Sequence, residues 1–155
     1  TETNDNLKDI IQKYQAALKL NVDPTQGKTL YQANCAFCHQ LSGKMGRTFG
    51  PDLGTVHGWA PRDIITNILD PNRSISHGYD MWNVTLNNGE LVQGIISTET
   101  PTALTLTDVN GLIRNIGRQD IQSLKALNMS AMPVGLEKKI TPQGMMDLLS
   151  FLRSN

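Results

Sequence analysis

The pentapeptide Cys35-Ala36-Phe37-Cys38-His39 constrains this 155-residue chain more than any other feature, because it contains both cysteines. Two cysteines three positions apart can form a disulfide, supply half of a zinc site, act as a redox dithiol or anchor a haem. A dithiol of the thioredoxin type needs a βαβ setting, which the sequence pattern does not show. A structural zinc site needs four ligands, and only His57 and His77 remain outside the motif. The haem anchor is therefore the favoured interpretation.

The order of the residues in the motif suits haem chemistry. Haem carries two vinyl groups, and each can form a thioether with a cysteine. Two intervening residues allow one helical turn to present Cys35 and Cys38 to one edge of the ring. His39 then lies under the iron and can bind it through a ring nitrogen. The motif predicts one covalently attached haem c with His39 as an axial iron ligand, and no disulfide is expected.

Helical periodicity surrounds this motif. We predict helices over about 7–18, 24–34, 61–69 and 142–152, and the last three begin at Asp23-Pro24, Ala60-Pro61 and Thr141-Pro142. An acceptor or proline at these positions is typical of a helix N-terminus. The first helix is amphipathic, and we interpret residues 1–22 as a covering helix or linker, with the main domain spanning 23–155.

The pattern changes to alternation after Pro71. Trp82, Val84 and Leu86 alternate with polar residues, and Asn88-Gly89 and Asn110-Gly111 are turn signals. These features predict a small antiparallel meander over about 81–124, with a short last strand over 121–124. We therefore expect a mainly α fold with a β insertion.

Composition limits the classes of partner. Lys+Arg and Asp+Glu are equal at 14 each, so the formal net charge is zero, and no long basic run suggests nucleic-acid binding. No apolar run approaches the roughly 18 residues of a membrane span. The first residues are polar and unlike a signal peptide, so we interpret the chain as a mature form or an excised domain.

Several ordered pieces of the sequence extend beyond the haem motif. They are Gly27-x-x-Leu30-Tyr31-x-x-Asn34, Gly50-Pro51-Asp52-Leu53, Ile68-Leu69-Asp70-Pro71, Gly78-Tyr79 and Met132-Pro133-x-Gly135-Leu136. With the motif, they resemble class I cytochromes c, and most closely the haem-binding domain family of planctomycete and verrucomicrobial type. The resemblance spans about 27–152. It implies a cytochrome c-type helical haem fold, with the meander inserted between the third core helix and the loop that carries an axial methionine.

The resemblance also implies roles for two residues near the iron. The carbonyl of Pro51 would accept a hydrogen bond from the non-ligating nitrogen of His39 and raise its basicity. Met132, which precedes a proline as the ligand does in such proteins, would be the second axial ligand. Met129 is the alternative ligand, and His57 and His77 are weaker rivals.

Three residues flank the expected haem pocket in sequence. Trp59, Arg62 and Arg73 carry a ring N–H or a guanidinium that can hydrogen-bond a haem propionate, as such residues do in related cytochromes. Packing of the tryptophan and solvation of the arginines is the alternative interpretation.

His/Met ligation closes both faces of the iron, so we expect an electron carrier rather than an enzyme. Its partners would be redox proteins: a donor dehydrogenase and an acceptor cytochrome or oxidase. Because haem attachment in bacteria occurs outside the cytoplasm, the resemblance implies a periplasmic or exported protein. Two other functions remain open: a gas- or peroxide-binding sensor or enzyme with a displaceable methionine, and an electron-accepting docking domain of a larger dehydrogenase.

Overall fold

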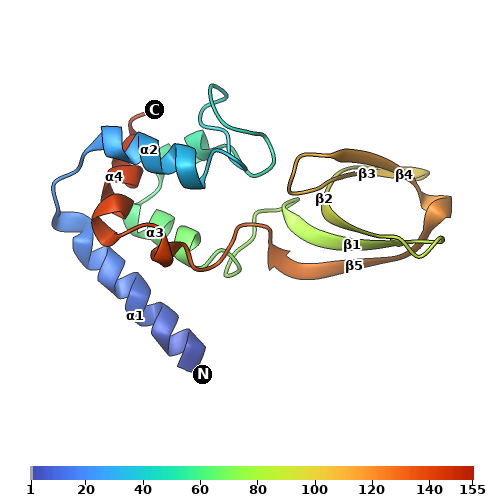
Figure 1. Cartoon of the computed structure of the whole chain (residues 1–155), viewed down its shortest axis with the longest axis horizontal. Helices are drawn as coiled ribbons and strands as arrows, with labels where there is room; N and C mark the ends of the chain where they lie inside the picture. The colour runs from blue at the N-terminus through green and yellow to red at the C-terminus, as the bar shows by residue number, and fades with distance from the viewer. Residues whose placement is uncertain (1) are drawn as a thin grey trace. The chain divides into compact units, whose positions relative to one another are not determined.

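The structure, a computed structural model, describes residues 2–155 of the chain, with side chains from residue 5 onward. The chain forms two compact units. One unit contains the chain as far as Arg73 together with Pro133–Asn155, and it is helical. The other, Ser74–Met132, is a β-sheet (Figure 1). The chain thus leaves the helical unit once, builds the sheet and returns.

Four α-helices form the helical unit. They are α1 (Glu2–Ala16), α2 (Pro24–Asn34), α3 (Pro61–Leu69) and α4 (Pro142–Arg153). Short 3₁₀ turns lie between them at η1 (Ala17–Lys19), η2 (Leu53–Gly58) and η4 (Leu136–Lys138). Three of the α-helices begin with proline, whose missing N–H is unneeded at that position. The four helices pack around one core, in which Tyr31, Ile65, Met145 and Leu148 are fully buried.

The contact of α2 with α4 is the closest in this unit. A Cβ placed on Gly27 would overlap the backbone carbonyl of Asp147 in α4 and come within 2.8 Å of the Phe151 side chain. The buried carboxylate of Asp147 accepts a hydrogen bond of 2.8 Å from the amide of Asp23, the N-cap of α2. The side-chain amide of Gln143 donates to the same oxygen at 3.0 Å. The start of α2, which leads to the cysteine motif, is therefore fixed to α4.

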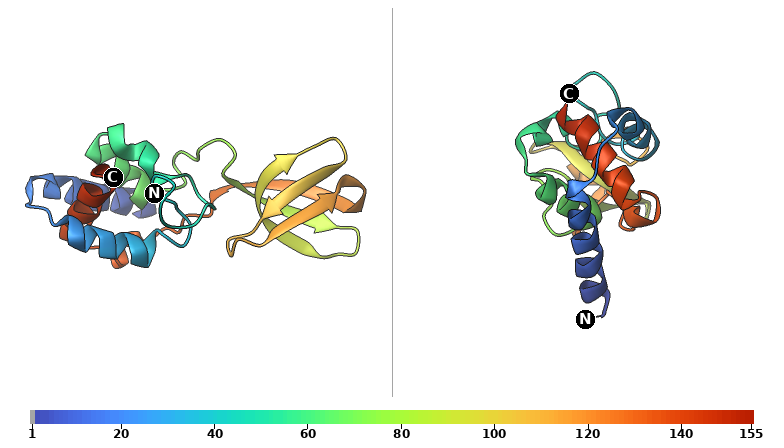
Figure 2. Two further views of the ribbon diagram at one scale, coloured as in Figure 1. Left: turned by 90° about the horizontal axis from the view of Figure 1, so that it is seen from above. Right: turned by 90° about the vertical axis from the view of Figure 1, so that its left-hand side faces the viewer.

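The sheet unit consists of five antiparallel strands in the order β4-β3-β2-β1-β5. They are β1 (Asp80–Leu86), β2 (Leu91–Glu99), β3 (Ala103–Thr107), β4 (Ile113–Gly117) and β5 (Ile121–Ser130). A short 3₁₀ turn, η3 (Arg118–Asp120), allows β5 to return to the far side of the sheet and pair with β1. The sheet is strongly twisted and curls around one face (Figure 2).

Alternation of apolar residues gives the sheet its own core. Val84, Leu104 and Leu106 are almost fully buried, and they pack with Leu86, Val92 and Ile116. Each of these residues lies on the inner face that the curled strands enclose. The sheet therefore has an apolar core of its own.

The expectation of a mainly α fold is wrong. The chain is 39% helical and 25% strand, with a five-stranded antiparallel sheet. The short strand predicted over 121–124 extends to Ser130. Its last residues lie beyond a register irregularity between the pairs Trp82–Ala126 and Asp80–Ser130, where alternation gives no guide to the end of a strand. The sheet that was expected as an insertion in a helical fold is thus a five-stranded unit that makes up a quarter of the chain.

The packing of Gly27 gives a test of the helical unit. We expect Gly27→Ala to lower the free energy of unfolding by about 3 kcal/mol, because the added methyl would overlap the backbone of α4. Chemical denaturation of the haem-loaded protein measures this. Gly58→Ala is the matched control, because a Cβ there meets nothing within 4 Å, and it should change stability by less than about 0.5 kcal/mol. Equal effects of the two substitutions would contradict the close packing of α2 on α4.

Candidate functional site

The cysteine motif lies at the C-terminal end of α2. The amides of Cys35 and Ala36 both donate to the carbonyl of Tyr31, which ends the helix. A further turn follows, because the amides of Cys38 and His39 donate to the carbonyl of Cys35 at 3.1 and 2.8 Å. The backbone from Cys35 to His39 therefore forms one compact turn. Cys35 and Cys38 are both free and half-buried.

The ring of His39 is held by a backbone carbonyl. Its Nδ1 lies 2.7 Å from the oxygen of Pro51. Since a carbonyl only accepts, Nδ1 carries the proton, and Nε2 keeps its lone pair. Burial lowers the pKa of His39, and the hydrogen bond to Pro51 opposes this only in part. The histidine is thus a neutral imidazole with one nitrogen available to a metal.

Three neighbouring residues fix the position of that ring. The hydroxyl oxygen of Tyr31 lies 2.8 Å from the carbonyl oxygen of His39 and 3.1 Å from that of Met45, and it is the hydrogen-bond donor to these carbonyls. This interaction joins the turn that contains the cysteines to the loop that follows. Gly46 lies so close that a Cβ would overlap the carbonyl of His39. A Cβ on Gly50 would lie 2.7 Å from Cε1 of the imidazole. Side chains larger than hydrogen at these two positions would displace His39.

The two cysteines are protonated thiols. Burial, followed by the proximity of Cys38, raises the pKa of Cys35 to about 12. Burial also raises the pKa of Cys38, although the nearby guanidinium of Arg47 opposes the shift. A catalytic dithiol requires a lowered pKa, so these thiols do not suit redox catalysis. Arg47 stacks over the exposed ring of Phe37, 4.5 Å from its centroid.

Asp52 stabilises the loop that carries the Pro51 carbonyl. Its carboxylate accepts hydrogen bonds from the amides of Ser42 (2.7 Å), Gly43 (2.8 Å) and Gly54 (2.7 Å). Ser42 and Gly43 both have positive φ, so this turn needs such support. The bond from Gly54 is the largest cause that lowers the pKa of Asp52, and those from Ser42 and Gly43 add to it.

The remaining predicted site residues lie in several elements. Trp59 follows η2 and is exposed, Arg62 is exposed in the first turn of α3, and Arg73 is exposed in the turn that follows α3. His57 and His77 are exposed. Met132 is half-buried at the end of the sheet unit, and Met129 is exposed in β5. The predicted roles of all these residues remain predictions.

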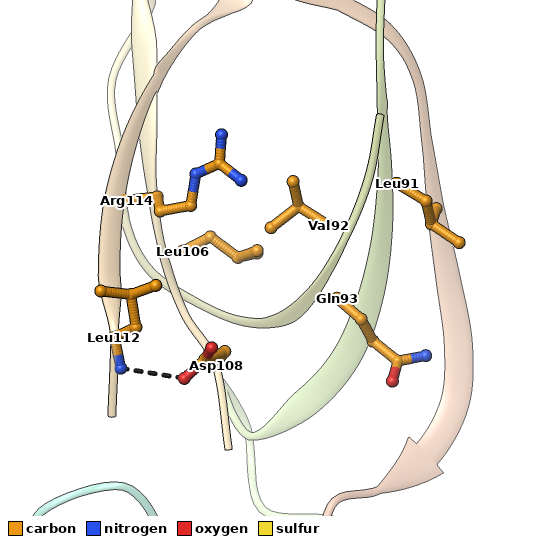
Figure 3. A pocket seen from close by; sticks show the side chains of 7 residues that line it. All are labelled: Leu91, Val92, Gln93, Leu106, Asp108, Leu112 and Arg114. Carbon is orange, nitrogen blue, oxygen red and sulfur yellow. Dashed lines mark hydrogen bonds between the residues drawn. The ribbon is translucent and has the colours of Figure 1, made fainter. Parts of the chain in front are cut away.

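The sheet unit carries a hollow of about 220 Å³ on its own surface. Figure 3 shows its seven lining side chains: Leu91, Val92, Gln93, Leu106, Asp108, Leu112 and Arg114. Asp108 accepts the amide of Leu112 at 2.9 Å, and Arg114 pairs with Glu90. Its two charged side chains, Asp108 and Arg114, are therefore already used in local interactions.

Comparison with known families agrees with the motif. A family model described as cytochrome c matches residues 24–114, more than half of the chain, so the protein belongs to the cytochrome c family. The match includes the cysteines, His39 and Pro51 but ends before Met132. No significant match is found among curated proteins.

Membership in this family implies covalently attached haem c, haem-based electron transfer and redox partner proteins. The residues present fit that group, because two free thiols that can form the thioethers lie within one turn of a neutral imidazole whose Nε2 is available to the iron. Among residues 2–155, no cluster of three or more His, Cys, Asp or Glu side chains suits a metal ion such as zinc.

The described residues also include no helix with the length and hydropathy to cross a membrane. Cytochrome c domains are typically exported or periplasmic.

Sequence reasoning did not assign roles to Tyr31, Gly46 or Asp52. Tyr31 and Asp52 lie within the pieces that carry the family resemblance, which was the only available signal. Gly46 lies in a glycine-rich loop without a motif. Their functions depend on contacts across the irregular loop that follows His39, and these contacts are visible only in the folded structure.

The hydrogen bonds of Asp52 predict a pH dependence. Since the folded state lowers the pKa of this carboxyl, its ionised form stabilises the fold above the ordinary value of 3.8, and this contribution is lost as the pH falls through the folded-state pKa. Asp52→Asn should therefore be less stable than the natural protein at pH 7, and the difference should shrink below about pH 4. Urea denaturation between pH 3 and 7 measures this. A difference independent of pH would contradict the role of the charged carboxylate.

Proposed function

We propose that this protein is a monohaem c-type cytochrome that transfers one electron at a time with His/Met-ligated iron. The sequence contains a single Cys-x-x-Cys-His motif, which supports the attachment of one haem. When bound, the haem supplies an iron couple that gains and loses one electron. In this proposal Cys35 and Cys38 form the thioethers, and His39 is one axial ligand through Nε2.

The hydrogen bond between His39 and Pro51 is the observation that carries this proposal. It holds the imidazole in one tautomer and increases the electron density on Nε2. The half-buried surroundings exclude water from the ring, so it stays neutral. A rigid, neutral ligand favours electron transfer, because little has to move when the charge on the iron changes.

Met132 is the proposed second ligand. Its thioether is soft and neutral, and such a donor raises the reduction potential of haem iron. It directly precedes Pro133, where the chain re-enters the helical unit. With both axial positions filled, small molecules would have no open site on the iron, which favours electron transfer over gas sensing or peroxide chemistry.

The partners would be a donor dehydrogenase and an acceptor cytochrome or oxidase, bound weakly and over a small interface. Trp59, Arg62 and Arg73 are the proposed contacts for the haem propionates. The proposed location is the periplasm or another exported compartment, where haem attachment takes place in bacteria. The main domain would comprise 23–155, with residues 1–22 as an N-terminal helix or linker.

Mass spectrometry of the denatured protein tests the number and attachment of haem. We expect one haem per chain, retained after denaturation because thioethers are covalent. Cys35→Ser and Cys38→Ser should each leave one thioether, and the double variant should lose all covalently bound haem. Haem that dissociates from the natural protein on denaturation, after maturation in a competent host, would contradict this attachment.

Optical spectroscopy with carbon monoxide tests the second ligand. The ferric natural protein should show the weak far-red band of methionine-bound haem, and the ferrous protein should not bind carbon monoxide. Met132→Ala should abolish the band, allow carbon monoxide to bind and lower the reduction potential by more than about 100 mV, within the roughly 0.8 V range set by axial ligands. Met129→Ala is the matched control and should leave all three properties unchanged. Ready binding of carbon monoxide by the natural protein would instead support a sensor or enzyme.

A further inference from the structure

The end of the sheet leads directly to Met132. Ser130, the last residue of β5, pairs with Asp80, the first residue of β1. The segment that enters the sheet unit and the segment that leaves it are therefore attached to two residues that pair with each other. The amide of Met132 donates to the hydroxyl oxygen of Ser130 at 3.1 Å. This hydrogen bond fixes the backbone of Met132 to the terminal pair of the sheet.

A bulge in β5 precedes this terminal pair. Between the pairs Asp80–Ser130 and Trp82–Ala126, three residues of β5 lie opposite Met81 alone. Asn128, in the middle of the three, has φ +51°, a conformation that asparagine adopts more readily than most residues. Continuation of the earlier register would place Asn128, rather than Ser130, opposite Asp80. Ser130 therefore occupies the position that Asn128 would have in a regular strand. The two extra residues thus shift the chain that follows by about 7 Å along the strand axis, compared with a strand without the bulge.

The bulge also separates the two candidate methionines. Met129 lies within it, and its side chain is 46% exposed. Met132 lies beyond the terminal pair, is half-buried, and has its amide hydrogen-bonded. Bulges next to functional sites commonly redirect one side chain. Here the redirected segment is the one that carries Met132.

We propose that the β-sheet positions the second axial ligand, with Ser130 and the Asn128 bulge as the positioning elements that present Met132 and exclude Met129. This inference rests on the proposed ligation by Met132. It gives the inserted sheet a role in the haem site: the terminal pair of β1 and β5 limits the conformations of the ligand loop. Loss of that restraint increases the fraction of molecules in which methionine leaves the iron.

The test compares single variants of the haem-loaded protein. Ser130→Ala removes the acceptor for the Met132 amide. The loss of one such hydrogen bond should change the equilibrium between methionine-bound and methionine-free iron by roughly fivefold. We expect a roughly fivefold faster binding of carbon monoxide to the ferrous protein and a weaker far-red band in the ferric protein. Ser97→Ala is the matched control, because the hydroxyl of Ser97 also makes a hydrogen bond with the backbone of the same sheet, in this case by donating to the carbonyl of Thr105. It should leave both signals unchanged.

Two variants of the bulge provide a second test. Asn128→Gly permits the positive φ and should behave as the natural protein, whereas Asn128→Val disfavours it and should reproduce the effect of Ser130→Ala. Circular dichroism verifies that the sheet is retained. Unchanged carbon monoxide binding and far-red absorption in Ser130→Ala would overturn the positioning role while leaving ligation by Met132 intact. Absence of the far-red band from the natural protein would instead reject the proposed ligation itself.

Discussion

The hydrogen bond from Nδ1 of His39 to the carbonyl of Pro51 is the interaction on which the rest of the candidate site depends. It selects the tautomer, so that only Nε2 remains to bind a metal. It also joins the turn after α2 to Pro51, which lies 12 residues further along the chain than His39. Tyr31 strengthens this junction from within the helical core, and Asp52 stabilises the loop from its exposed side.

The electrostatics of the site follow from burial. The thiols of Cys35 and Cys38 and the imidazole of His39 are all uncharged at neutral pH, because burial disfavours their charged forms. A redox dithiol needs a thiol whose pKa is lowered, so this pair does not suit that role. In a covalent haem site the two thiols would form the thioethers and the neutral imidazole of His39 would bind the iron, and the close packing of Gly46 and Gly50 against His39 holds that residue in place.

The sheet is a compact unit with its own apolar core. In the sequence it lies between the two segments that form the helical unit. Its core residues contact one another inside a curled surface. Because its first and last strands are paired at Asp80 and Ser130, the chain leaves and returns at one place. An insertion of this kind lengthens the sequence between His39 and Met132 without separating the segments of the helical core.

The sequence by itself determined the haem motif, the α2, α3 and α4 helices and most of the sheet, because these depend on local spacing, caps and alternation. It did not reveal the balance of helix and strand, since the strands were interpreted as a small insertion in a helical fold, whereas they form a five-stranded unit with an apolar core of its own. Only the tertiary structure decided which groups meet His39. Tyr31, Gly46, Gly50 and Asp52 act through contacts across the loop, and such contacts have no periodic signal in a single chain.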